Sequence, residues 1–212
     1  MKLLIKSILD VALGLILLIA LSPLLSLIAI AIKLDSKGPI IFKQLRAGKN
    51  GQPFRIYKFR TMVDNAVNMG LGLRLAQNDS RITTVGHFLR NWSLDELPQI
   101  INIIRGEMSF VGPRPAMCDQ IEYYDNVQRK RLLMKPGITG WAQVNGRNSL
   151  TWEERMPLDV WYVNNFSLML DFKIFAKTFT VLLFKKGLYA KTGINEGYGP
   201  SLISKAKSRQ LS

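Results

Sequence analysis

The sequence contains very little cysteine, histidine or acidic residue. Its 212 residues include one cysteine, Cys118, and one histidine, His87. A single cysteine excludes an intrachain disulfide, and a single histidine excludes His-rich metal sites and argues against a His-dependent catalytic triad. The chain has 15 Asp and Glu against 29 Lys and Arg, a formal net charge of +14. This excess favours anionic partners: nucleic acid, an anionic membrane face or a phosphate-bearing substrate.

A long hydrophobic run near the N-terminus is the most prominent feature of the sequence. Residues 11–32 contain no charged side chain. As a straight helix this run would be about 33 Å long, enough to cross the hydrocarbon core of a bilayer. It is also too long for a typical signal-peptide core, and no clear cleavage site follows it. The default prediction is therefore a transmembrane helix.

Two features favour a different path for this helix. Ser22-Pro23 lies in the middle of the run, and an interior proline removes a backbone hydrogen bond and kinks a helix. Basic residues flank both ends, Lys2 and Lys6 before the run and Lys33 and Lys37 after it, so the positive-inside rule finds little asymmetry. A re-entrant helix that leaves by the face it entered satisfies both flanks. From the residues alone, a re-entrant helix and a kinked span remain equal alternatives.

The rest of the chain is long enough for one soluble domain. Residues 40–62 read as two strands around a Gly/Asn/Pro turn, with Lys58 and Arg60 on one face. Residues 64–80 read as a loop, and residues 86–108 and 152–166 have helical patterns, the first of them broken. A helix is also expected over 118–134, and a short strand within 135–152.

An aromatic stripe at helical spacing follows Asp171, which we expect at a helix start. Its members are Phe172, Phe175, Phe179 and Leu182, and lysines border it. Such a stripe suits a helix that faces the core, or an amphipathic helix in the membrane interface. The tail from Gly187 looks irregular.

Four polar, turn-rich segments do not look like mere scaffold: 57–62, 90–99, 106–115 and 136–148. They place basic side chains among rigid or aromatic neighbours, and a fixed guanidinium suits phosphate oxygens. Ordinary salt bridges explain most single arginines, but here the acids are too few to pair with them all.

The second of these segments contains "SLDELPQ" at residues 93–99. Ser93 and Glu96 have the spacing of a helix capping box, and that explanation suffices for most isolated matches. Alternatively, Asp95 and Glu96 form a working pair of carboxylates. Pro98 complicates the capping box, because it would be the fifth helical residue and could not donate to the carbonyl of Leu94. The first turn must therefore distort, or the helix must start later.

Together the four segments resemble those of the small monotopic phosphoglycosyl transferases, bacterial sugar transferases that load a polyprenyl phosphate carrier. The resemblance runs from the basic N-terminus to about residue 186. It implies a mostly helical α+β fold with a small β-hairpin and interfacial amphipathic helices. It also implies that residues 1–37 form a re-entrant membrane helix broken at Ser22 and Pro23. A catalytic domain over 38–186 would follow, at the cytoplasmic face of the bacterial inner membrane, and then a tail over 187–212.

The resemblance further implies a reaction and a set of roles. The substrates would be a UDP-sugar and polyprenyl (undecaprenyl) phosphate, with Mg2+ required and UMP released. Asp95 and Glu96 would be the catalytic pair and the metal ligands, with Asp95 attacking the phosphorus that bears the sugar. The expected phosphate- and substrate-binding residues are Lys58, Arg60, Arg90, Arg114, Asn145, Arg147 and Asp159. Asn145, Arg147 and Asp159 are the candidates for the nucleotide side.

The positive charge and the hydrophobic run also allow other partners and functions. An anionic lipid bilayer is an expected partner, and a homodimer is left open. A nucleic-acid-binding protein would explain the charge, but the basic and aromatic residues form no known reading motif, so no nucleic-acid partner is expected. A membrane-anchored scaffold would explain the hydrophobic run but not the four polar segments.

Overall fold

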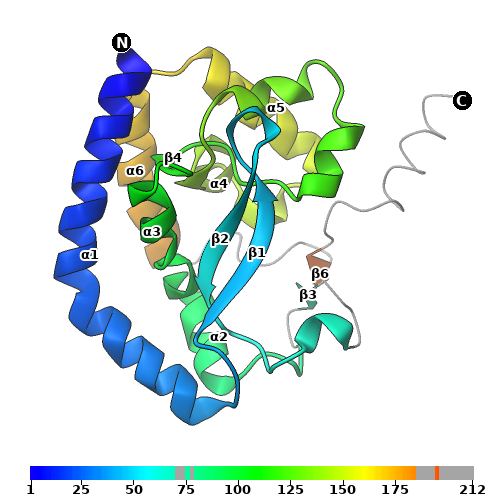
Figure 1. Ribbon diagram of the computed structural model, residues 1–212. Helices are drawn as coiled ribbons and strands as arrows, with labels where there is room; N and C mark the ends of the chain where they lie inside the picture. The colour runs from blue at the N-terminus through cyan, green and yellow to red at the C-terminus, as the bar shows by residue number, and fades with distance from the viewer. Residues whose placement is uncertain (70–74, 77–78, 185–193, 196–212) are drawn as a thin grey trace, which may run out of the picture.

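The structure is a computed structural model that describes residues 1–69, 75–76, 79–184 and 194–195. It is mostly helical with small β-sheets, as the α+β expectation required, and α1 runs along one side of the remaining elements (Figure 1). The elements are α1 (Lys2–Asp35), β1 (Ile41–Ala47), β2 (Pro53–Phe59), β3 (Leu75–Ala76), α2 (Thr84–Asn91), α3 (Gln99–Ile104), β4 (Ser109–Val111), β5 (Gly137–Thr139), α4 (Trp141–Val144), α5 (Trp152–Asn164), α6 (Leu168–Leu183) and β6 (Ile194–Asn195).

The predicted hairpin is present. β1 and β2 pair antiparallel from Ile41 opposite Phe59 to Ala47 opposite Pro53. The turn between them contains Asn50 and Gly51, both with positive φ angles, which is the turn chemistry that the Gly/Asn/Pro signal predicts. The other pairs are short: β4 with β5 in parallel, which includes the strand expected within 135–152, and β3 with β6 antiparallel.

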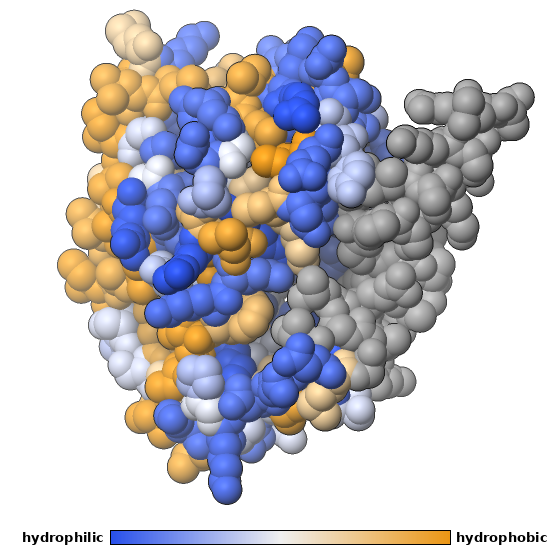
Figure 2. Space-filling view, turned by 45° about the vertical axis from the view of Figure 1, so that its right-hand side comes forward, coloured by the Kyte–Doolittle hydropathy of each residue, from blue (hydrophilic) through white to orange (hydrophobic). Residues whose placement is uncertain are grey.

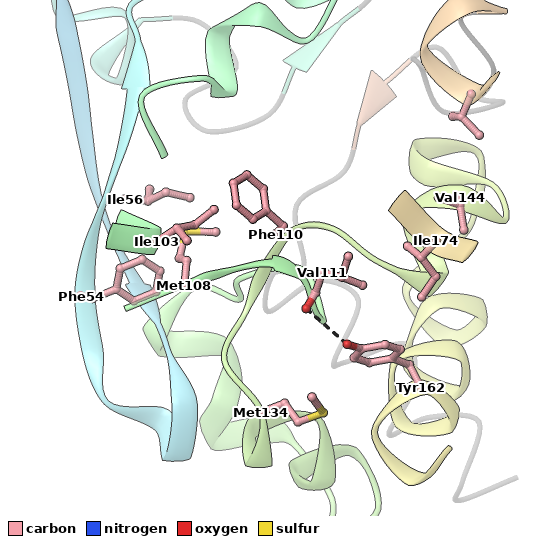
Figure 3. Close-up of a cluster of buried hydrophobic side chains, with 11 residues drawn as sticks. Phe54, Ile56, Ile103, Met108, Phe110, Val111, Met134, Val144, Tyr162 and Ile174 are labelled. Atoms are coloured by element: carbon pink, nitrogen blue, oxygen red, sulfur yellow. Dashed lines mark hydrogen bonds between the residues drawn. The ribbon is translucent and has the colours of Figure 1, made fainter. Parts of the chain in front are cut away.

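The main hydrophobic core joins the hairpin to the helices behind it (Figure 3). Ile56 of β2 and Ile103 of α3 are 3% and 0% exposed. Tyr162 of α5 is also fully buried, and its hydroxyl donates a hydrogen bond to the carbonyl of Val111 at 3.3 Å. The core therefore fixes β2, α3 and β4 relative to one another, and these elements carry or border three of the four polar segments.

α1 is a single helix that continues through Pro23 and bends along its length (Figure 1). Proline cannot supply the amide that would bond to the carbonyl of Ile19, four residues before it. The Ser22 hydroxyl donates to that carbonyl instead, at 2.8 Å. The Ser-Pro pair thus introduces a kink while satisfying the group that the kink would leave without a partner.

Most of the surface of α1 is apolar and exposed, as the orange band along its edge of the molecule shows (Figure 2). Ile16, Ile19 and Leu34 are 63%, 75% and 83% exposed. Among the described residues, α1 is the one helix long and apolar enough to cross a membrane. Its exposed surface is suited to lipid, because water would oppose so large an apolar area.

Polar contacts attach the inner side of α1 to the domain. Near its start, Lys6 is buried against Asp171 of α6 and lies 3.7 Å from Asp10, so it is not a freely exposed flanking charge. Near its end, the Asp35 carboxylate accepts the amide of Val85 at the start of α2, at 3.0 Å. Both ends of α1 therefore contact the same domain.

The single helix expected over 118–134 is absent. Residues 118–134 form two short 3-10 helices, Cys118–Tyr123 and Gln128–Leu133, and not one helix. Asp125 lies between them, and its carboxylate accepts the amides of Val127 and Gln128 in a local turn that competes with a continuous helix.

The aromatic stripe of α6 faces the core only in part, because Phe175 is partly buried against the core and its ring meets that of Phe110 edge to face. Ile174 and Val181 are the buried residues of this helix, whereas Phe172 and Phe179 are 69% and 57% exposed. The helix begins after Ser167, whose hydroxyl accepts the amide of Leu170, so Asp171 lies in its first turn. Residues 70–74 and 77–78 of the predicted loop at 64–80 lie outside the described residues. So does the predicted tail at 187–212, except for residues 194–195.

We predict that Gly86→Ala destabilises the protein. A Cβ at position 86 of α2 would lie 2.1 Å from the carbonyl oxygen of Thr61, which is backbone and cannot rotate away. We expect a loss of about 1–3 kcal/mol in the free energy of unfolding, measurable as a lower Tm in detergent. In the matched control, Gly14→Ala, the new Cβ meets the Ile104 side chain at 3.1 Å, and that side chain can shift. Equal Tm values for the two variants would contradict the prediction.

Candidate active site

Asp95 and Glu96 lie in a strained connection between α2 and α3. A short 3-10 helix, Leu94–Glu96, follows Ser93, which has a left-handed backbone with φ of 56°. The Ser93 side chain makes no capping bond, so the capping-box interpretation is wrong. Its hydroxyl instead accepts a hydrogen bond from Nη2 of Arg147 at 2.8 Å. α3 begins after Pro98, as expected of a proline that cannot donate to the preceding turn.

Glu96 is held by two cations on one of its oxygens. Nζ of Lys58 lies 2.6 Å from Oε1 and Nη2 of Arg114 lies 3.1 Å from the same atom. The Glu96 side chain is 15% exposed. Burial alone would raise the pKa of Glu96, but Lys58 and Arg114 outweigh it and hold this pKa well below its usual range. Glu96 is therefore a fixed anion at neutral pH.

Asp95 is in the opposite situation. Its half-buried carboxylate makes no hydrogen bond or ion pair with the part of the chain that the structure describes. Burial raises the pKa of Asp95; Lys58 and Arg90 oppose this rise, and the negative Glu96 adds to it. The two adjacent carboxylates thus differ: Glu96 is held by two cations, whereas Asp95 has no hydrogen-bond or ion-pair partner among the described residues.

Two further predicted residues border the pair. Arg90 comes from α2, and its Nε donates to the hydroxyl of Thr61 at 2.7 Å, which orients the guanidinium. Arg147 has a left-handed φ of 51° and reaches Ser93. The structure therefore brings Lys58, Arg90, Arg114 and Arg147 together around Asp95 and Glu96.

The remaining three predicted residues have other partners. Arg60 is buried against the end of α1, where it donates to the carbonyls of Lys37 and, at 2.8 Å, Ser36. Asn145 donates to the Trp141 carbonyl and accepts from Lys177. Asp159 pairs with Arg131 at 2.6 Å, both side chains being 2% exposed. The structure does not place these three at the carboxylate pair.

Two arginines that the sequence did not single out support Arg114. Arg131 donates to the backbone carbonyl of Arg114 at 2.8 Å, and Arg46 of β1 donates to the next carbonyl, that of Pro115, at 3.3 Å. Burial and repulsion by Arg114 lower the pKa of Arg46 to about 10. The sequence placed Arg46 within a predicted strand but could not predict its contact with Pro115, because the two residues are 69 positions apart.

The carboxylate pair is compatible with the Mg2+ that the resemblance implied. Among the described residues no group of three or more His, Cys, Asp or Glu side chains could hold a metal. Mg2+, however, commonly binds one or two carboxylates together with substrate phosphates and water. The free carboxylate of Asp95 and Oε2 of Glu96, which makes no hydrogen bond to described residues, provide such a donor set.

Comparisons with known proteins identify the family to which the chain is similar. Residues 1–185 match the family model described as bacterial sugar transferase. The chain is 42% identical to an uncharacterized sugar transferase, EpsL, of Bacillus subtilis, over 86% of this chain and 89% of that protein. It is 42% identical to the exopolysaccharide production protein ExoY of Sinorhizobium fredii, over 85% and 86%. It is also 44% identical to the UDP-glucose:undecaprenyl-phosphate glucose-1-phosphate transferase of Escherichia coli, over 78% of this chain but 37% of that protein.

We predict that Arg131→Met unfolds the protein more readily than the double change Arg131→Met/Asp159→Leu. The single change leaves Asp159 buried without its cation, which costs about 3–5 kcal/mol, whereas replacing both partners by apolar residues removes that penalty. Denaturant unfolding in detergent measures both variants. A single variant as stable as the double would contradict the prediction.

Proposed function

The chain belongs to the bacterial sugar transferase family, and we propose that it transfers a sugar-1-phosphate from a UDP-sugar to undecaprenyl phosphate, releasing UMP. This would be the first membrane step in assembling a polysaccharide or another glycoconjugate. The names of the relatives, one of which specifies UDP-glucose and undecaprenyl phosphate, support these substrate classes. The observation that carries the proposal is the free Asp95 beside a Glu96 that two cations fix in place.

In the proposed first step, an oxygen of Asp95 attacks the phosphorus that bears the sugar. A bond forms between that oxygen and phosphorus, and the bond from phosphorus to the UMP oxygen breaks, so that UMP leaves with the electron pair. In the second step an oxygen of undecaprenyl phosphate attacks the same phosphorus and releases Asp95. The product is undecaprenyl-diphosphate-sugar, and the carboxylate is regenerated.

Attack by an anion on an anionic diphosphate is opposed by charge. Two unit charges 4 Å apart repel by about 4 kcal/mol at an effective dielectric of 20. Lys58, Arg90, Arg114 and Arg147 surround the pair and would offset this repulsion and the charge that develops in the transition state. Mg2+ held by Asp95 and Glu96 would neutralise phosphate oxygens further.

The low pKa of Glu96 bears on its proposed role. A general base works best when its pKa is near the working pH, and Glu96 is held far below that value by Lys58 and Arg114. These contacts favour a role in holding cations over one in removing a proton from undecaprenyl phosphate.

We also propose that α1 is a re-entrant membrane helix and that the site faces the cytoplasm. Lys6 near the start of α1 and Asp35 at its end both contact the catalytic domain, so both ends belong on the side where that domain lies. The bend near Ser22-Pro23 and the exposed apolar surface agree with a helix that dips into one leaflet and returns. The phosphate of a lipid acceptor lies at the same interface as the site.

We predict a burst of UMP from UDP-sugar and Mg2+ without any lipid acceptor, at most one per active site. A double displacement forms the enzyme-bound phosphosugar before the acceptor arrives, and intact-mass analysis should detect this adduct on Asp95. Asp95→Asn should lose both burst and turnover, because an amide is a poor nucleophile. Asn165→Ala, at the exposed end of α5, is the control that keeps both.

A different kinetic pattern would contradict the covalent step. If UMP forms only after undecaprenyl phosphate is added, and double-reciprocal plots converge instead of running parallel, the reaction proceeds through a ternary complex. Asp95 and Glu96 would then be metal ligands without a covalent step.

We predict that residues 2 and 37 are both inaccessible from the periplasm. In a Cys118→Ser background, Lys2→Cys and Lys37→Cys should react with a membrane-impermeant maleimide only after intact cells are permeabilised. Replacing Ser22 and Pro23 by Ala and Leu should straighten the helix toward a full span, which exposes one of the two positions. Labelling of position 2 in intact cells with the native Ser-Pro pair would rule out the re-entrant path.

A further inference from the structure

Asn102 of α3 is a polar residue with 0% exposure in the middle of the hydrophobic core. Its side chain makes three hydrogen bonds. Nδ2 donates to the carbonyl of Arg55 at 2.8 Å and to Oε2 of Glu107 at 2.7 Å, and Oδ1 accepts the amide of Tyr57 at 3.0 Å. All three groups of a neutral amide are thus satisfied, which a buried side chain of this kind requires.

Two of these bonds replace a missing strand. β2 pairs with β1 along one edge, and the described residues form no third strand along the other. The carbonyl of Arg55 and the amide of Tyr57 point from that free edge toward Asn102. Because a side-chain amide carries the donor and acceptor of a peptide group, Asn102 closes the edge as a neighbouring strand would.

This contact joins the two parts of the chain that carry the clamp on Glu96. Lys58 directly follows Tyr57 on β2, and Glu96 shortly precedes α3, which carries Asn102. Ile56 and Ile103 also pack between these elements (Figure 3). Apolar packing is not directional, however, whereas a two-point hydrogen bond fixes the position of a strand along its own axis.

The contact between Lys58 and Glu96 is sensitive to the position of β2 along its own axis. One residue of strand spans about 3.3 Å, and the distance from Lys58 Nζ to Glu96 Oε1 is 2.6 Å. A displacement of β2 by a fraction of one residue is therefore comparable to the length of this contact, and the Lys58 side chain would have to change its conformation to keep it. We propose that Asn102 is a positioning residue, which sets the position of β2 against α3 and thereby the contact of Lys58 with Glu96.

The expected effect of Asn102 on kcat rests on the proposed function, whereas its expected effect on the contact of Lys58 with Glu96 does not. Its test uses Asn102→Leu, which removes all three bonds, and Asn102→Asp, which keeps an acceptor for Tyr57 but loses both donors. Ile174→Ala is the matched control, because Ile174 is also 0% exposed but lies on α6 and touches neither element by hydrogen bonds. All proteins are compared as folded material in the same detergent.

The first measurement is the rate at which an amine-reactive ester labels Lys58, with the exposed Lys43 of β1 as internal reference. The ion pair with Glu96 protects Lys58 in the wild type. Both Asn102 variants should raise the Lys58 to Lys43 labelling ratio about fivefold or more, as expected when one hydrogen-bonded contact is lost, and Ile174→Ala should not change it.

The second measurement is steady-state kinetics. Misplacement of a catalytic group by about 1 Å can cost up to about a hundredfold in rate, so kcat should fall at least tenfold in both Asn102 variants. KM for the UDP-sugar should stay within about twofold, because the lost interaction acts in the transition state. Ile174→Ala should lose stability with kcat per folded molecule retained.

The two measurements separate the possible failures. Unchanged Lys58 labelling in folded Asn102→Asp and Asn102→Leu overturns the inference, whatever the activity. A labelling change that Ile174→Ala reproduces also overturns it, because Asn102 would then act through stability alone. If the wild type releases no UMP from any UDP-sugar, the proposed function fails, while the labelling ratio still decides the role of Asn102.

Discussion

The arrangement of the site depends on one shared contact, in which Lys58 and Arg114 meet at the same oxygen of Glu96. Lys58 comes from the hairpin, Arg114 from the segment after β4, and Glu96 from the turn before α3, so this single atom joins three parts of the fold. A half-buried carboxylate without cations would be costly. With them, Glu96 stays ionised, and its neighbour Asp95 has no hydrogen-bond or ion-pair partner among the described residues.

Buried polar contacts also attach α1 to the rest of the domain. Lys6 is buried against Asp171, Arg60 donates to carbonyls at the end of α1, and the Asp35 carboxylate accepts an amide at the start of α2. Buried polar contacts are directional, so they fix where a long apolar helix lies, which lipid contacts cannot do. α2 carries Arg90 and leads directly to Asp95. The position of α1 is therefore coupled, through its contact with α2, to the position of the site.

Local sequence signals predicted the hairpin and the start of α3. They failed at 118–134, where the local turn at Asp125 interrupts the expected helix, and at the capping box. The hairpin and the delayed start of α3 followed from turn residues and from Pro98, and the structure contains both. The capping box was wrong, because Ser93 has a left-handed backbone and makes no capping bond, and its hydroxyl accepts from Arg147, 54 residues away. The aromatic stripe of α6 was ambiguous because periodicity identifies a face but not what covers it. The roles of Asp95 and Glu96 came from the family resemblance, since two adjacent acids alone do not distinguish a free carboxylate from a clamped one.

The basic residues at and around the site form two groups that composition cannot separate. Arg46, Arg60 and Arg131 donate to backbone carbonyls and hold the segments around the site in place. Lys58, Arg90, Arg114 and Arg147 surround the carboxylate pair itself. A guanidinium suits both tasks, because its planar array of donors can bind several carbonyls or two phosphate oxygens. A surplus of arginine therefore predicts an anionic ligand only for those members that the fold brings to one place. In this chain Arg46 and Arg131 donate to the backbone carbonyls of Pro115 and Arg114, and so help to hold Arg114 at that place.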